Sequence, residues 1–407
     1  MKILTVNCVY RKGSTGKIVN DIKNGLVADG HEVVVCYGRG ERTDDHGVYK
    51  TSGELYSKLN NLSSRFTGVM YGGCRFSTAR LISVIKKESP DVVHLHCING
   101  YFVNIYKLVT WLKENKIPTV LTLHAEFMHT GGCSHAFECE KWAQDPGCGS
   151  CHRRKDATKS IFLDGTRRMW TKMRGAFDGF DKGLCVVSVS PWLAERAGRS
   201  PILAGKDHVV VKNGVDTGVF HPVPTERDGD VTTVFHATAH FSASPDHSKG
   251  GYYLLELARA LKDQPVRFIV AGDHSQIDDI PENVTLLGEV SDQSRLAEYY
   301  SAADLTLLTS KRETFSMVTA ESLCCGTPVI GFRAGGPEGI AIPEYSRFVD
   351  FGDVEGLKDA FFALRGLKNE VGAQKIAARS FAEYDSSVMY AEYLKIYENL
   401  VKEDYGR

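Results

Sequence analysis

The sequence predicts an α/β protein built from two doubly wound domains in series. Three observations lead to this prediction. Short apolar, strand-like runs alternate with helix-like segments along most of the chain. The alternation stops once, at residues 212–227, and then restarts. A length of 407 residues is also too great for one ordinary core.

The first half of the chain carries the pattern of βαβ units on a parallel sheet. Each short apolar run is followed by a stretch whose apolar residues recur at helical spacing. The expected strands are 2–6, 32–36, 91–96, 119–123 and 184–189, and the expected helices include 16–28 and 103–115. We assign residues 1–215 to a first domain on the acceptor side, with a Cys-rich insertion at 129–155.

An Asn-Gly turn and two prolines at 212–227 predict a linker, after which the pattern is repeated. The expected strands are then 232–236, 267–271, 284–287, 305–309 and 329–332, and the expected helices 250–261, 292–301, 316–325, 356–367 and 388–401. We assign 216–386 to a second, donor-binding domain and expect 387–407 to pack back on the first domain. Ligands of such sheets bind beyond the carboxyl ends of the strands, so we expect the site in a cleft between the domains.

The strongest site signal is the segment 310–332, "SKRETFSMVTAESLCCGTPVIGF". Glu313 stands just before an expected helix, and Glu321 follows two turns later. The free N–H groups at the helix start suit a phosphate, whereas the two carboxylates suit sugar hydroxyls. The alternative interpretation is an ordinary acidic helix start with a solvated face.

Three further segments carry weaker signals. Lys249 opens a Gly-rich helix start and could neutralise a phosphate, or be an ordinary solvated lysine. Gly13 and Gly16 form a glycine turn after the first strand that fits neither a Walker loop nor a dinucleotide fingerprint. His124 ends a strand and could bind a sugar or move a proton, or be a satisfied histidine at the edge of a core.

Together these segments resemble the family 4 retaining glycosyltransferases, which have the GT-B fold of two Rossmann-like domains facing a cleft. "ETFSMVTAE" followed by "GTPVI" fits the E-x7-E pattern of that family, Lys249-Gly250 fits its phosphate site, and "VVVKNGVDTGVFHP" resembles the end of its first domain. "GSTGKIVNDI", "HLHCINGYFVNI" and "TLHAEFMHTGGC" resemble a subgroup linked with bacterial exopolysaccharide and capsule synthesis.

The resemblance implies a hexosyltransferase-type enzyme that moves a sugar from a nucleotide-diphosphate sugar to a glycan or lipid-linked acceptor, with retention and without a catalytic metal. It implies catalytic roles for Glu313, His124 and Lys249, and donor-binding roles for Glu321, Phe315, Ser316, Met317, Val290, Gly13, Gly16 and His240. The glycine turn and His124 would also serve the acceptor side and the sugar pocket. In two places the sequence departs from the family pattern: Ala125 follows His124 where the subgroup has Asp, and His240 stands where an arginine is usual.

These departures motivate a different class of function, a non-catalytic nucleotide-sugar-binding or scaffold protein of the same fold. A nucleotide-sugar epimerase of the GT-B fold is another alternative, although the E-x7-E pattern argues against it.

Four cysteines fall close together in the insertion and predict a structural zinc site, with disulfides or free thiols as alternatives. They are Cys133, Cys139, Cys148 and Cys151. The segment 167–177 mixes basic and apolar residues. It predicts either a peripheral contact with an anionic membrane or an amphipathic helix packed on the first domain.

Bulk properties limit the partners and the compartment. A net charge of −1 gives no overall attraction to nucleic acid. Eleven cysteines without an export signal, and no apolar run of about 18 residues, lead us to expect a cytoplasmic protein. A peripheral position on the inner face of the plasma membrane is the alternative location.

Overall fold

The computed structural model describes residues 1–225 and 230–402. The predicted linker at 212–227 and the predicted final segment at 387–407 therefore lie partly outside the described residues. The chain divides into two compact units. The first is Met1–Val211 together with the chain from Met389 onward, and the second is Lys212–Val388.

The first unit is built on a seven-stranded sheet in which every pairing is parallel. Its order is β3 (Val48–Lys50), β2 (Glu32–Tyr37), β1 (Lys2–Asn7), β4 (Val92–Leu95), β5 (Thr119–Leu123), β6 (Leu184–Ser188) and β7 (Asp207–Val210). Leu4 pairs with Val34 on one side and Val93 on the other. The winding reverses between β1 and β4, which is where doubly wound sheets bind ligands.

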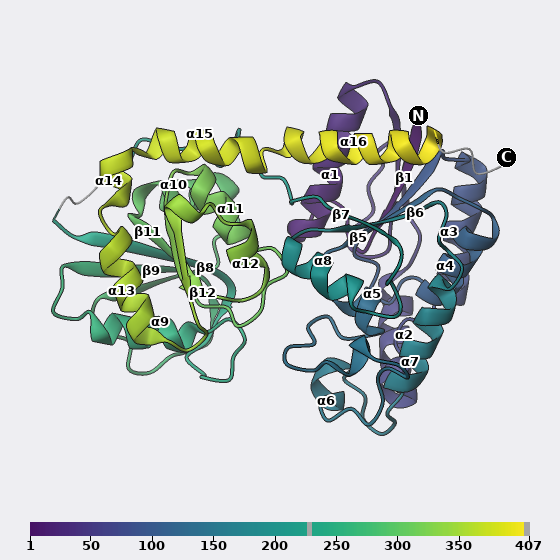
Figure 1. Cartoon of the computed structure of the whole chain (residues 1–407), viewed down its shortest axis with the longest axis horizontal. Helices are drawn as coiled ribbons and strands as arrows, with labels where there is room; N and C mark the ends of the chain where they lie inside the picture. Colours follow the sequence, from purple (N-terminus) through teal and green to yellow (C-terminus); the bar gives the residue numbers. More distant parts are fainter. Residues whose placement is uncertain (226–229, 403–407) are drawn as a thin grey trace. The chain divides into compact units, whose positions relative to one another are not determined.

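Helices cover both faces of this sheet (Figure 1). The helices of the unit are α1 (Gly13–Ala28), α2 (Glu54–Thr67), α3 (Arg75–Glu88), α4 (Ile105–Glu114), α5 (Phe127–Thr130), α6 (Arg154–Ala157), α7 (Thr166–Phe177), α8 (Pro191–Gly198) and α16 (Ser386–Lys402), with a 3-10 turn η1 at Lys141–Ala143. α1 and α16 share one core with the sheet, to which α16 contributes Tyr393 and Tyr397. This packing buries the apolar face that gives the C-terminal segment its helical periodicity.

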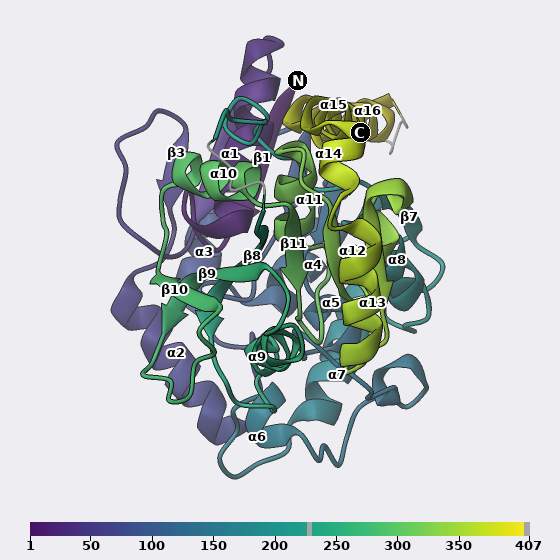
Figure 2. The same ribbon diagram turned by 90° about the vertical axis from the view of Figure 1, so that its left-hand side faces the viewer.

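The second unit repeats the same winding on a six-stranded parallel sheet. Its order is β10 (Val284–Gly288), β9 (Val266–His274), β8 (Thr232–Phe241), β11 (Leu305–Leu308), β12 (Val329–Phe332) and β13 (Ser346–Val349). The reversal falls between β8 and β11. Its helices are α9 (Gly251–Ala260), α10 (Gln293–Ala302), α11 (Met317–Cys324), α12 (Gly336–Ile340), α13 (Val354–Leu364), α14 (Leu367–Val371) and α15 (Ala373–Tyr384), with a 3-10 turn η2 at Pro343–Tyr345. α9 lies beside α13, and α10 beside α11, as the two views show (Figures 1 and 2).

The predicted fold of two doubly wound domains is confirmed, but two boundaries near the site were predicted wrongly. α1 begins at Gly13, so the expected glycine turn at 13–16 is the first turn of the helix. β8 continues past residue 236 to Phe241 because a bulge restores its pairing with β9, where His240 faces Asp273. His240 is therefore a strand residue and not part of a phosphate loop.

Helix α7 contains the segment 167–177, for which the sequence left a membrane contact and a packed amphipathic helix as alternatives. Its apolar side chains Met169, Trp170, Met173 and Phe177 are almost fully buried in the first unit. The amphipathic helix packed on the first domain is thus the correct alternative for this helix's apolar face. Among the described residues, none of the helices combines the length and apolar character needed to span a bilayer.

Candidate active site

Lys249 and Glu313 meet beyond the carboxyl ends of the two strands that flank the reversal in the second sheet. Lys249 follows β8 and Glu313 follows β11, and the ammonium Nζ lies 2.6 Å from the carboxylate Oε1. The two residues are 64 positions apart in the chain. Neighbouring parallel strands bring their following loops together, which accounts for the contact.

The loop before α9 is fixed against the loop after β11 by two hydrogen bonds, both donated by the loop after β11. Thr309 Oγ1 donates to the carbonyl of Lys249 over 2.9 Å, and the N–H of Lys311 donates to the carbonyl of Ser248 over 2.8 Å. Gly250 has a φ of +66° and lies so close to Thr309 that a Cβ would meet its carbonyl oxygen at 2.1 Å. Glycine is therefore required beside Lys249, and the backbone of the lysine is tied to the loop after β11.

Glu313 is fixed through its own backbone. Its N–H donates to the carbonyl of Ala334, and the N–H of Gly336 donates to its carbonyl over 2.9 Å. The Glu338 carboxylate in turn accepts the N–H groups of Ala334 and Gly335. The Glu313 side chain is partly exposed, so it can reach a ligand as well as Lys249.

The helix that follows Glu313 starts at Met317, one residue after the start predicted at 316. Ser316 is the N-cap of α11, and its hydroxyl accepts the N–H of Thr319 over 3.2 Å. Its φ of +88° is rare for a residue with a side chain, and such strained backbone clusters at functional sites. The remaining N–H groups of the first turn, near Met317, have no acceptor within the helix, so this end suits an anion.

Glu321 and Val290 line one recess of about 290 Å³ at the carboxyl ends of β8, β9 and β10. Its other walls are Ala237, Thr238, Ala239, Ala271, Gly272, Glu289, Leu296, Tyr300 and Val318. The Tyr300 hydroxyl donates to Glu321 Oε2 over 3.3 Å, and burial together with this carboxylate raises the pKa of Tyr300 well above its usual value. The structure thus brings the predicted donor-site residues Glu321 and Val290 together in one recess, where Tyr300 positions the Glu321 carboxylate.

His240 lies near the end of β8 with a half-exposed side chain. Its Nδ1 is 3.5 Å from a carboxylate oxygen of Asp273, and its ring contacts that of His247. Burial and the neighbouring His240 and Lys249 lower the pKa of His247. Because a carboxylate faces His240, this histidine is a weak replacement for the arginine expected near the diphosphate.

In the first unit, the predicted His124 contacts a histidine that sequence reasoning missed. His124 Nε2 lies 3.1 Å from His96 Nδ1, at the ends of the neighbouring strands β5 and β4. The ring of His94 contacts that of His96, and His94 Nδ1 forms a hydrogen bond of 2.6 Å with the hydroxyl of Tyr397 in α16. His96 Nε2 is buried and lacks a hydrogen-bond partner among the described residues. A signal existed, because the alternation in "HLH" puts His94 and His96 on one face of a strand.

Burial lowers the pKa of His124 to about 4, and the pKa of His94 and His96 is lowered well below the usual value for the same reason. For His124, the unfolded chain takes up a proton below pH ~6.5, whereas the folded unit takes it up only near pH 4. The free energy of unfolding therefore decreases as the pH drops through this window, and His94 and His96 act in the same direction. We expect the free energy of unfolding at pH 5 to be lower than at pH 7 by about 1–2 kcal/mol for His124 alone.

Urea unfolding at the two pH values checks this expectation. His124→Gln should reduce the pH dependence, whereas His46→Gln, at an exposed position of the same unit, should leave it unchanged. Equal pH slopes for wild type and His124→Gln would show that the ring is already solvated and titrates normally.

Gly13 and Gly16 lie on the first turn of α1, and only one of them is sterically confined. Gly13 has a φ of +64° and open space around its Cα. At Gly16 a Cβ would come within 3.2 Å of the backbone N of Arg11. This turn stands beyond the end of β1, on the carboxyl edge where His96 and His124 also lie.

The Cys-rich insertion is attached to the first unit by a buried ion pair. Glu126, which is fully buried, accepts from Arg196 Nε over 2.7 Å and from the N–H of Ala136 over 2.8 Å. Arg196 Nη1 reaches Glu140 over 3.2 Å, and its guanidinium lies 4.8 Å from the centre of the Trp142 ring. Sequence reasoning missed this network, since Glu126 and Arg196 are 70 positions apart.

The four cysteines of the insertion lie near enough to affect the pKa of Cys133, but they do not form a metal site. Burial first, and then the neighbouring Cys148, Cys151 and Cys139 thiols, raise the pKa of Cys133 to about 12. Among the described residues, no group of three or more His, Cys, Asp or Glu side chains lies close enough together to hold a metal ion. The side-chain positions therefore do not fit the predicted tetrahedral zinc site.

Two family descriptions match the chain. Residues 15–219, just over half of the chain, match the description "Glycosyltransferase Family 4", and residues 237–370 match "Glycosyl transferases group 1". The second match contains Lys249, Glu313 and Glu321.

Individual relatives agree with this assignment. WcaC of Escherichia coli K12, assigned to colanic acid biosynthesis as a glycosyl transferase, is 21% identical over 98% of this chain and 100% of that protein. N-acetyl-alpha-D-glucosaminyl L-malate synthase of Bacillus anthracis is 32% identical, but the match spans 31% of this chain and only 33% of that enzyme. The crystal structure of Anabaena HepE with UDP-glucose has a TM-score of 0.59 at 16% identity, covering 99% of this chain and 98% of that one, and so supports the shared fold.

Proposed function

Because the chain belongs to glycosyltransferase family 4, we propose that it transfers a sugar, with retention of configuration, from a nucleotide-diphosphate sugar to a glycan or lipid-linked acceptor in bacterial surface polysaccharide synthesis. One observation carries this proposal. Lys249 and Glu313 meet at 2.6 Å at the point where the second sheet reverses its winding, next to the start of α11.

In this proposal the donor lies along the carboxyl edge of the second sheet. The nucleoside occupies the recess of Val290 and Glu321, and Glu321 accepts hydrogen bonds from the ribose hydroxyls. The diphosphate rests on Lys249 and the N-terminal N–H groups of α11, near Phe315, Ser316 and Met317. UDP-glucose bound to HepE, which shares the fold, supports a nucleotide sugar as the donor.

The chemistry follows from the charges that develop in the transition state. Breaking the bond between the anomeric carbon and the phosphate oxygen leaves negative charge on the diphosphate and positive charge on the sugar. Lys249 stabilises the first, and because its ammonium has three N–H donors it can keep Glu313 as a partner. Glu313 accepts hydrogen bonds from the transferred sugar and holds its reacting carbon in place.

The acceptor hydroxyl attacks the anomeric carbon from the face of the leaving group, and its proton goes to the departing phosphate oxygen. No protein nucleophile is needed for this step. His124 and His96 are neutral at pH 7 because burial lowers the pKa of both, so they can orient sugar hydroxyls by hydrogen bonds without adding charge. We assign Gly13, Gly16 and His124 to the acceptor side.

Release of free nucleotide from a panel of UDP-, ADP-, GDP- and TDP-sugars tests the proposal. We expect slow hydrolysis of one donor, acceleration by a glycan acceptor, and loss of both in Glu313→Ala. Thermal stabilisation by nucleotides without turnover of any donor, even with acceptors, would instead identify a scaffold protein. Conversion of a donor to its epimer without an acceptor would identify an epimerase.

For the Cys-rich insertion, structural zinc stays a hypothesis that the side-chain positions do not favour. Elemental analysis of protein purified without chelator decides it. About one equivalent of zinc per chain would support the site, and less than about a tenth of an equivalent would remove it.

A further inference from the structure

Helix α2 of the first unit buries polar residues and exposes apolar ones, the opposite of an ordinary surface helix. The residues it buries are Ser57 and Ser64, whereas four large apolar side chains are exposed. These are Leu55 at 72%, Leu59 at 56%, Leu62 at 49% and Phe66 at 48% exposure. Their spacing of four, three and four positions puts them on one face, here called the α2 stripe.

A second exposed apolar segment, 161–163, extends the α2 stripe. Its members Ile161, Phe162 and Leu163 are all about half exposed or more. The N–H of Ile161 donates to the carbonyl of Arg65 over 2.8 Å, and the ring of Phe162 stacks on that of Phe66 at 6.2 Å. A contiguous exposed apolar surface of this kind marks a docking site in a globular protein.

The surroundings of this surface are strongly basic. Residues 54–80 and 152–174 carry twelve basic side chains, which are Lys58, Arg65, Arg75, Arg80, Arg153, Arg154, Lys155, Lys159, Arg167, Arg168, Lys172 and Arg174. They carry three acidic ones, which are Glu54, Asp156 and Asp164. The whole chain has 49 basic and 50 acidic residues, so this excess is local.

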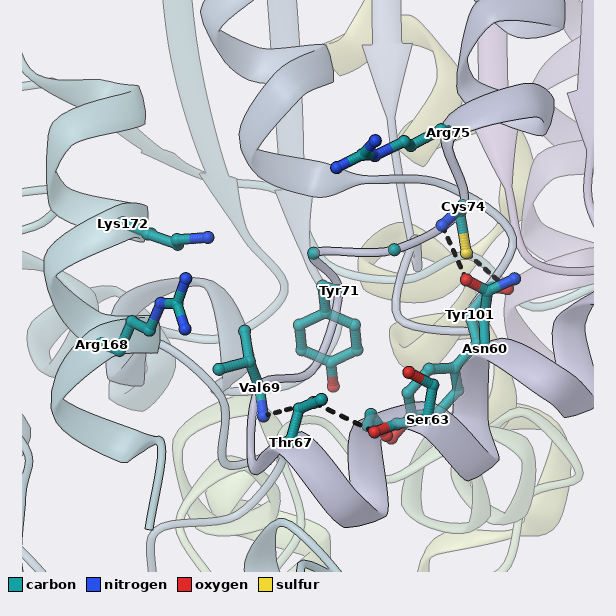
Figure 3. Close-up of a pocket in the computed structure, with 13 residues that line it drawn as sticks. Asn60, Ser63, Thr67, Val69, Tyr71, Cys74, Arg75, Tyr101, Arg168 and Lys172 are labelled. Carbon is teal, nitrogen blue, oxygen red and sulfur yellow. Dashed lines mark hydrogen bonds between the residues drawn. The ribbon is translucent and has the colours of Figure 1, made fainter. Parts of the chain in front are cut away.

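The opposite face of α2 lines a polar recess of about 270 Å³ together with α7 and the start of α3. Figure 3 shows Arg168 and Lys172 of α7 and Arg75 of α3 directed into it from two sides, and Thr67, Ser63 and Tyr71 also line it. In the described part of the chain, none of these three cations forms a salt bridge with a carboxylate. A recess with unneutralised cations and hydroxyl groups is suited to a phosphate.

We propose that the α2 stripe and the segment 161–163 insert into the surface of an anionic phospholipid bilayer, with a lipid phosphate held in the recess of Arg75, Arg168 and Lys172. An apolar helix face with basic residues beside it is the composition of interfacial membrane helices. A second copy of the chain is a poor occupant, because a two-fold contact would bring the same basic residues face to face. The inference stands apart from the proposed transfer reaction, since neither the surface nor its test involves a donor.

Flotation with vesicles of phosphatidylcholine containing about 30% phosphatidylglycerol tests the proposal, with vesicles of phosphatidylcholine alone as the comparison. We expect the wild-type chain to bind the anionic vesicles and to lose roughly 10- to 30-fold in affinity in Arg168→Gln/Lys172→Gln, about fivefold for each charge. Lys182→Gln/Lys262→Gln removes two exposed charges elsewhere and should leave binding unchanged.

The apolar part is tested with Leu59→Ser/Phe66→Ser, which should weaken binding by about tenfold or more. Val27→Ser/Phe362→Ser changes two exposed apolar residues outside the surface and is the matched control. All four positions are exposed, so thermal melting should stay near wild type. Absence of vesicle binding by the wild-type chain would overturn the proposal. Undiminished vesicle binding by the Leu59→Ser/Phe66→Ser variant would also overturn it. That result would indicate a purely electrostatic contact, of the kind that an acidic protein partner would also make.

Discussion

Replacing Lys249 by Ala is expected to lower kcat/KM for the donor by about 100- to 1,000-fold. In the proposed donor pose the ammonium lies where negative charge develops on the leaving diphosphate, so we expect kcat to fall more than donor affinity. Stability should hardly change, because the ion pair with Glu313 is partly exposed and such pairs contribute little. Initial rates of nucleotide release over a range of donor concentrations separate the two effects.

Lys262→Ala is the control for Lys249→Ala, since it removes an exposed lysine from the same unit. Glu313→Gln supplies a second comparison, because it removes the carboxylate charge and leaves Lys249 in place. If Lys249→Ala changed both kcat and KM by less than about threefold, the lysine would not face the diphosphate and the proposed donor pose would be wrong.

Replacing Arg196 by Met is expected to lower the free energy of unfolding by about 3–5 kcal/mol. The substitution leaves the Glu126 carboxylate buried without its guanidinium partner, which lies 2.7 Å away. It also removes one of the two arginine contacts of Glu140 in the Cys-rich insertion. Urea unfolding of the full chain, followed by near-ultraviolet circular dichroism, measures the change.

Arg199 provides a matched control for this second prediction. It also pairs with Glu140, but its side chain is 47% exposed, so Arg199→Met should cost less than about 1 kcal/mol. Removing both charges in Glu126→Met/Arg196→Met should recover part of the loss. Equal stability of Arg196→Met and Arg199→Met would contradict the prediction. It would mean that Glu126 is protonated or paired with another group in the Arg196→Met variant.

The ion pair of Glu126 and Arg196 should also make the stability of the folded unit depend on pH in the acid range. Burial by itself would raise the pKa of Glu126, but His129, Arg196 and the N–H of Ala136 lower it to about 2. The carboxylate therefore stabilises the folded unit above pH ~4.5, and this contribution is lost as the pH falls from there toward 2.

Burial explains why several strands could be predicted from the sequence. β1, β5, β6, β11 and β12 are almost completely buried, so each is a continuous apolar run of the kind that parallel sheets contain. β3, β7 and β13 were not predicted. They are short edge strands with largely half-buried or exposed residues, and they carry no such run.

The site residues that lie in one sequence motif could be predicted, whereas those that come together from separate strands and helices could not. Glu313, Glu321 and the start of α11 fall within one short segment, so spacing alone suggested their roles. Tyr300, Glu289 and Thr238 join Glu321 in the recess from three different elements, and periodicity does not show which of their side chains converge. The same limit applies to the exposed stripe of α2, whose leucines have the spacing of a core face.

A crystal structure of the chain with a bound nucleoside diphosphate tests the central claim most directly. The account predicts phosphate oxygens within about 3.2 Å of Lys249 Nζ and of the first N–H groups of α11, with ribose hydroxyls on Glu321. A diphosphate bound away from α11, with Lys249 still bonded only to Glu313, would contradict it.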